Sequence, residues 1–105
     1  MNAPAPLPYR ITKMELYRFL LRLRSEGAEI HVVPVASDGW HVKVDGHRRS
    51  NLELSGMCNA AGVRDGVHYP FSDPGCYLIT LDRIGMDSET QTIFDAASRG
   101  EWREK

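Results

Sequence analysis

Residues 28–45 read AEIHVVPVASDGWHVKVD, and this stretch decides the predicted fold. Its first half is rich in β-branched residues, and residues 40–45 alternate between apolar and polar side chains, as half-buried strands do. The segment Ser37-Asp38-Gly39 between the two halves has the composition of a turn. The stretch therefore predicts a β-hairpin.

The register of this hairpin predicts which side chains face the core. A loop of either two or four residues would place one set together on the face toward the first helix: His31, Val33, Val35, Trp40, Val42 and Val44. The same register places His31 and His41 on opposite faces, so they could not share a metal ion. Pro34 has no N–H to donate, which predicts that its amide side faces a sheet edge or a bulge.

Three helix starts are predicted around the hairpin from their capping-box spacing: Thr12-x-x-Glu15, Ser50-x-x-Glu53 and Ser88-x-x-Gln91. The first helix, over about residues 13–26, has its apolar residues at three and four spacing, so one face should be buried. The second is expected over about residues 51–61, and the third begins at Ser88. Glycines at positions 27 and 62 are suited to end the first two helices.

The rest of the chain adds one or two strands. Residues 76–82 form a strong strand pattern, and residues 67–71 form a weaker one that Pro70 interrupts. The sequence therefore predicts a single α+β domain over residues 10–105, after an extended proline-rich tail at residues 1–9. Its expected architecture is an antiparallel sheet of three to four strands with three helices, in the order α-β-β-α-(β)-β-α.

Composition excludes several classes of protein. The 105 residues are 42% hydrophobic and 26% charged, which is typical of one globular domain. No apolar run approaches the roughly 20 residues that span a bilayer, and the first residues lack the pattern of a signal peptide. We therefore expect a cytoplasmic protein without a membrane partner, in which Cys58 and Cys76 are free thiols rather than a disulfide.

The net charge of −1 conceals an asymmetry along the chain. Residues 1–49 carry eight Lys or Arg against five acids, whereas residues 50–105 carry five against nine. The uniformly basic character of many nucleic-acid-binding domains is absent. A surface with two oppositely charged regions favours protein partners or self-association.

The best candidate site is the segment GHRRSN at residues 46–51. It combines a glycine turn, two guanidinium groups and the amino end of a helix, all of which favour an anion. The candidate residues are His47, Arg48, Arg49 and Ser50. Three interpretations remain open for them: a solvated loop, a contact for an acidic patch on a protein, and a contact for nucleic-acid phosphate.

Two further groups extend this candidate surface. Arg18 and Arg22 share one face of the first helix, although Glu15 and Glu26 lie at salt-bridge spacing from them. Tyr69 and Phe71 lie in a loop-rich region, and exposed aromatic side chains near arginines commonly anchor protein interfaces. The alternative for the aromatic side chains is that they close the open end of a small core.

No catalytic, metal or cofactor signature is present, so the sequence predicts neither an enzyme nor a cofactor. The four histidines do not form a metal-ligand spacing on any predicted helix. Cys76 with His68 is the one conceivable nucleophile and base, and a small thiol enzyme using them is retained as an alternative.

The leading functional hypothesis is therefore a non-enzymatic binding protein, a small regulator or inhibitor that acts by protein–protein contact. A protein encoded by a phage or mobile element and directed at a nucleic-acid-handling complex would fit this profile. The main alternative is direct nucleic-acid binding through Arg48, Arg49 and the arginines of the first helix. A homodimer through the hairpin edge near Pro34, or through the aromatic loop, is a further hypothesis.

Overall fold

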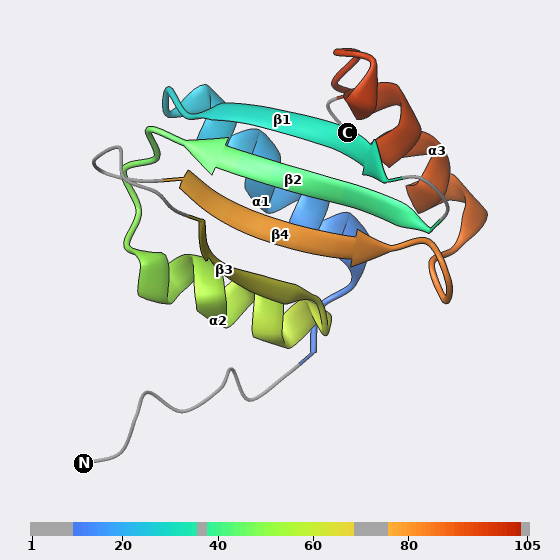
Figure 1. Cartoon of the computed structure of the whole chain (residues 1–105), viewed down its shortest axis with the longest axis horizontal. Coiled ribbons are helices and arrows are strands. Elements are labelled where there is room, and N and C mark those ends of the chain that lie inside the picture. Colours follow the sequence, from blue (N-terminus) through green and yellow to red (C-terminus); the bar gives the residue numbers. More distant parts are fainter. Residues whose placement is uncertain (1–9, 36–37, 69–75, 104–105) are drawn as a thin grey trace.

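The computed structural model describes residues 10–35, 38–68 and 76–103, which form one antiparallel sheet covered by helices (Figure 1). The predicted α+β class, with three helices and a sheet of up to four strands, is confirmed. The elements in chain order are α1 (Lys13–Ser25), β1 (Glu29–Val35), β2 (Gly39–Asp45), α2 (Asn51–Ala61), β3 (Arg64–His68), β4 (Cys76–Asp82) and α3 (Ser88–Ser98). The tail predicted at residues 1–9 lies outside the described residues.

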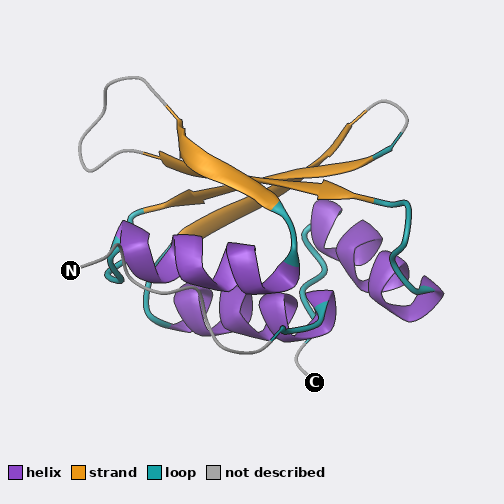
Figure 2. Cartoon of the chain, turned by 90° about the horizontal axis from the view of Figure 1, so that it is seen from below, coloured by secondary structure: helices purple, strands orange, loops and turns teal. Residues whose placement is uncertain are grey.

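The sheet has the strand order β1-β2-β4-β3, so β1 and β3 are its edge strands. All three strand pairs are antiparallel. Figure 2 shows α1, α2 and α3 on one side of the sheet, and no described helix covers the other side. The sheet thus has a buried inner face and an open outer face.

The predicted hairpin exists, but its predicted register was wrong. Val35 pairs with Gly39, which leaves three positions between them instead of two or four. An odd loop length changes which residues of β1 share a face with Trp40, because side chains alternate with a period of two. Ile30 and Val32 are therefore buried with Val42 and Val44, whereas the valines predicted to be inside, Val33 and Val35, are 41% and 39% exposed.

The same correction applies to the histidines of the hairpin. His31 pairs with Lys43, and His41 pairs with Val33, so both histidines lie on the outer face. The prediction that they occupy opposite faces was wrong for the same reason of loop parity.

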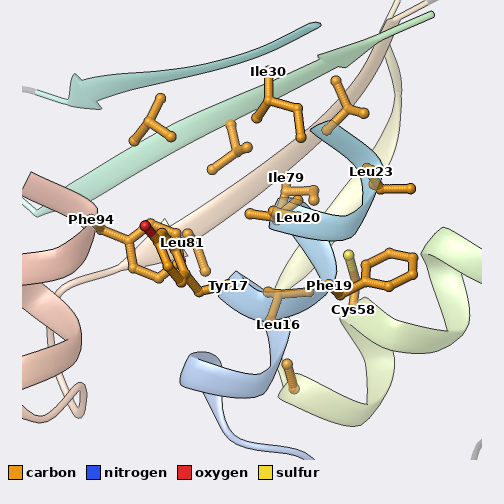
Figure 3. Close-up of a cluster of buried hydrophobic side chains, with 14 of the residues drawn as sticks. Leu16, Tyr17, Phe19, Leu20, Leu23, Ile30, Cys58, Ile79, Leu81 and Phe94 are labelled. Atoms are coloured by element: carbon orange, nitrogen blue, oxygen red, sulfur yellow. The ribbon is translucent and has the colours of Figure 1, made fainter. Parts of the chain in front are cut away.

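Helix α1 forms the centre of the core, and its start is as predicted. The Thr12 side chain accepts a hydrogen bond from the Glu15 amide, and the Glu15 carboxylate accepts one from the Thr12 amide. These bonds satisfy two of the amides that a helix start leaves unpaired. Figure 3 shows the α1 side chains Leu16, Leu20 and Leu23 among core residues of the sheet and of α2, and all three are no more than 1% exposed.

Aromatic rings connect α1, the sheet and α3. The Phe94 ring lies 5.4 Å from that of Tyr17 and 5.6 Å from that of Trp40 between centroids, and all three side chains are buried. After α3 the chain returns to the body of the protein, where Trp102 stacks on Tyr17 with ring centroids 5.7 Å apart. Tyr17, Trp40 and Tyr77 are thus all buried in the core.

Helix α3 begins one residue away from its predicted cap. Asp87, rather than Ser88, is the N-cap, and its carboxylate accepts hydrogen bonds from the amide and the hydroxyl of Thr90. The Gln91 side chain does not reach back to a cap; it donates to the carbonyl oxygen of Met86 at 2.7 Å. Aspartate and serine are comparably strong N-cap residues, so their preference alone does not decide between Asp87 and Ser88.

No helix among the described residues is long and apolar enough to cross a membrane.

Candidate partner-binding surfaces

Arg49, the centre of the predicted anion site, is held by two carboxylates of the protein itself. Its Nε and one terminal nitrogen donate to the two oxygens of Glu26 at 3.0 and 2.6 Å, and its other terminal nitrogen donates to Glu53 at 2.7 Å. The pair with Glu26 is bidentate, the geometry in which arginine binds carboxylates most strongly. It joins the end of α1 to the start of α2.

The electrostatics agree with this geometry. Hydrogen bonding to Arg49 lowers the pKa of Glu26 below its usual value of 4.5, and the charges of Arg49, Arg22 and Arg48 lower it further. The two carboxylates raise the pKa of Arg49. The side chains of Arg49 and Glu26 remain about one-third exposed, so water screens part of the attraction.

Two of the remaining predicted arginines, Arg22 and Arg48, lie near this ion-paired group. The Arg22 guanidinium lies 5.6 Å from the centre of the Phe19 ring, and that of Arg49 lies 6.0 Å from it. Arg48, Arg22 and Arg18 are all exposed. The Glu15 carboxylate accepts the hydrogen bond from the Thr12 amide that the capping-box spacing predicted. The structure therefore brings Arg22 and Arg48 close to one carboxylate, Glu26, that already has a stronger partner.

Ser50 and His47 both take part in the start of α2. The Ser50 hydroxyl accepts a hydrogen bond from the Glu53 amide, as the capping-box spacing predicted. The Glu53 side chain completes an ion pair with Arg49 instead of the reciprocal bond to Ser50. His47 Nε2 lies 3.1 Å from the Asn51 side-chain oxygen. These contacts account for Ser50, Arg49 and one ring nitrogen of His47, whereas His47 Nδ1 is buried without a hydrogen-bond partner among the described residues.

The two predicted aromatic contacts, Tyr69 and Phe71, lie outside the described residues. Sequence reasoning also paired His68 with Cys76, and the backbone register of β3 and β4 does place these two residues opposite each other. The other cysteine, Cys58, is a buried free thiol. Burial, and to a lesser extent the charge of Asp65, raises the pKa of Cys58 to about 12, so this thiol is not activated.

A second surface, which sequence reasoning identified only through Pro34, follows the edge of β1. A groove of about 360 Å³ runs along this strand and reaches the end of α3. One side of it is the β1 segment 30–34; the other consists of Ala97, Ser98, Gly100 and Trp102. The alternating strand pattern alone could not indicate this groove, because four of its nine lining residues lie more than 60 positions later in the chain.

Trp102 holds the end of this groove in place. The Trp102 ring stacks on the Tyr17 ring. The Arg24 guanidinium lies 4.7 Å from the centre of the Trp102 ring. The Tyr17 hydroxyl accepts a hydrogen bond from the Arg103 amide and donates one to the Arg103 carbonyl oxygen, at 2.7 and 2.8 Å. The segment that follows α3 is therefore fixed to α1 and forms a defined wall.

Within the residues that the structure describes, no group of three or more His, Cys, Asp or Glu side chains could hold a metal ion. Comparisons of the chain with protein-family models, with curated proteins and with solved structures find no match.

Proposed function

We propose that this protein is a non-enzymatic binding protein, a small regulator or inhibitor that acts by protein–protein contact through the β1 edge of its sheet. The observation that carries the proposal is the combination of an edge strand with exposed valines, Val33 and Val35, and a groove beside it. Exposed edge strands are ready sites for a further strand, and proteins usually protect them with charges or coverage. Along β1, Pro34 is the main protection of this kind.

The contrast with the arginine surface supports this choice of site. Arg49 already has two carboxylate partners, so a protein or nucleic-acid anion would have to displace one of them. Breaking a hydrogen-bonded ion pair leaves one charge without its partner, which opposes binding there. The β1 edge has no comparable obstacle among the described residues.

Capture of partners tests the proposal. The tagged wild type would be used for affinity purification from cells that encode it, beside a double variant with Val33→Lys and Val35→Lys. The matched control carries Leu52→Lys and Ile84→Lys, which place the same charges at two other exposed apolar positions, 61% and 83% exposed. We expect the same partner with the wild type and the control, and its loss with the β1 variant. Equal capture by all three proteins would refute binding through this edge.

Direct nucleic-acid binding is the second candidate, and the exposure of Arg22 and Arg48 favours it. Because Arg49 supports the fold, the clean variants are Arg22→Glu and Arg48→Glu. Phosphate contacts release counterions, so affinity for a duplex probe would fall steeply with salt and would be weaker in both variants. Absence of a shift at low salt would exclude this candidate.

The small thiol enzyme using Cys76 and His68 is tested by alkylation. In a Cys58→Ser background, an activated thiolate would react faster at neutral pH than a free cysteine and would slow after His68→Ala. Under the binding-protein proposal, His68→Ala leaves the alkylation rate of Cys76 unchanged.

A further inference from the structure

We infer that the β1 groove binds an extended segment of a partner protein as an added fifth strand, with one small apolar side chain of that segment against Ala97 and Trp102. The inference rests on the proposed function and specifies the chemistry of the partner. It begins from the backbone of β1, because an edge strand offers N–H and C=O groups on its unpaired side.

Pro34 indicates which backbone groups are available. In an antiparallel pair, residues alternate between those that exchange hydrogen bonds with the neighbouring strand and those whose N–H and C=O point away. Pro34 pairs with Trp40 and has no N–H. It can therefore lie in the ladder without losing a hydrogen bond to β2 only if it belongs to the residues whose N–H and C=O positions point away from β2. Ile30 and Val32 are four and two residues away and belong to the same set. Their amides then point away from β2, toward the groove that these residues line.

The size of the groove fits one strand. It follows five consecutive β1 residues, and an extended chain of five residues is about 17 Å long. A volume of about 360 Å³ is near the lower end of ligand sites and accommodates few side chains. Ala97 and Gly100 leave room beneath the strand, while Trp102 offers an apolar wall.

The same geometry disfavours a second copy of this chain as the occupant. In Figure 1, α3 extends past the β1 edge, into the region over which a neighbouring sheet would continue. A single strand can lie above this helix, whereas a second copy would bring its own α3 to the same place.

Charge adds one requirement for the partner segment. None of the nine residues that line the groove carries a negative charge, and Arg24 lies over the Trp102 ring at its end. Among the described residues, no carboxylate forms a salt bridge with Arg24. An acidic side chain at the Trp102 end of the segment would therefore be favoured over a basic one.

The test uses the full chain and a display library of nine-residue peptides. We expect enrichment of peptides that combine alternating small apolar residues with one acidic residue. Binding of a selected peptide should slow hydrogen exchange of the Ile30 and Val32 amides, because these become donors to the added strand. Enrichment of no peptide, or protection confined to other amides, would overturn strand addition.

Two variants and one control make the test specific. Val32→Pro removes an outward amide and should weaken peptide binding at least about tenfold. Ser98→Arg, at a half-buried position of the groove, should weaken binding similarly without changing the β1 backbone, which guards against misfolding of the proline variant. Ile84→Lys, at a site 83% exposed and outside the groove, should leave affinity unchanged.

The outcome separates this inference from the proposed function. If a captured partner is lost with Val33→Lys and Val35→Lys but the Ile30 and Val32 amides exchange unchanged in its complex, protein binding stands and strand addition fails. If the partner binds equally to the β1 variant, both fail. If the protein dimerises at high concentration and Val32→Pro abolishes the dimer, the β1 edge binds a second copy of the chain. That result would overturn the inference.

Discussion

The start of α2 and the edge of β1 differ in whether the protein itself supplies a partner for the group that could bind a ligand. At the start of α2, the arginine that the sequence marks as a ligand for anions is bound by Glu26 and Glu53. At the edge of β1, apolar side chains are exposed and a groove lies beside the backbone. The difference teaches that a charged side chain can find a partner within its own fold. The outward backbone groups of an edge strand have no partner in their own sheet and can pair with a strand of another chain.

The test with the largest expected effect compares a glycine of the β1–β2 hairpin, Gly39, with a glycine of α2, Gly56. Gly39 begins β2, and a Cβ added there would lie 1.9 Å from the Leu81 carbonyl oxygen, so the backbone of β4 would have to move. We expect Gly39→Ala to lower the free energy of unfolding by about 3 kcal/mol. Gly56 in α2 has open space around the added Cβ, so Gly56→Ala should raise it by about 0.5–1 kcal/mol.

Urea unfolding of both variants checks this pair of signs. If Gly39→Ala is as stable as the wild type, the close approach of β2 to β4 at this position is incorrect. The Gly56→Ala variant is the control, because it shows any general effect of adding a methyl group to a glycine.

A second test distinguishes the two faces of β1. Val32 is 5% exposed and Val33 is 41% exposed, although they are adjacent. Truncating Val32 to Ala removes buried methyl groups and should cost about 2 kcal/mol, whereas Val33→Ala should cost less than about 0.5 kcal/mol. The midpoints of urea unfolding of the two variants measure the difference in their stability, provided that the dependence of the unfolding free energy on urea concentration is unchanged. The reverse order would restore the hairpin register that the sequence predicted, with Val33 inside.

A third test compares the neighbouring arginines. Arg49→Met leaves Glu26 and Glu53 without their partner, so we expect the melting temperature to fall by a few degrees. Arg48→Met, at an exposed position outside these ion pairs, should leave it nearly unchanged. Thermal melts at low and high salt would check both values, since screening weakens exposed ion pairs. Equal effects of the two substitutions would contradict the internal role of Arg49.

The smallest expected effect is a pH dependence at the same ion pair. The pKa of Glu26 is lowered in the folded state, so its contribution to stability is present above its usual pKa of 4.5 and disappears as the pH falls through the folded value. The difference in melting temperature between the wild type and Glu26→Gln should therefore shrink below about pH 4.5. The Asp87 carboxylate, whose pKa is also lowered, is common to both proteins and cancels in this comparison. A difference that stays constant with pH would show that Glu26 acts through packing alone.

Much of the architecture could be predicted because its signals are local. The capping box at Thr12 and the strand at residues 76–82 each depend on neighbouring residues, and the structure confirms both elements. The cap of α3 was misplaced by one residue, since Asp87 and Ser88 are both suitable caps and the sequence pattern does not rank them by geometry.

The candidate sites were less predictable. Arg48 and Arg49 are adjacent and chemically identical in the sequence, yet only Arg49 pairs with Glu26, which lies 23 positions earlier. The groove requires the segment after α3 to return beside β1, and no periodicity of either segment indicates that contact.

The sequence by itself determined the kinds and order of the elements, because helix caps, turn residues and apolar periodicity act over a few residues. Only the tertiary structure decided which face of β1 is buried, which arginine is neutralised and where a groove remains. Those three outcomes depend on the parity of one loop and on contacts between distant segments, and both are set by how the sheet and the helices pack together.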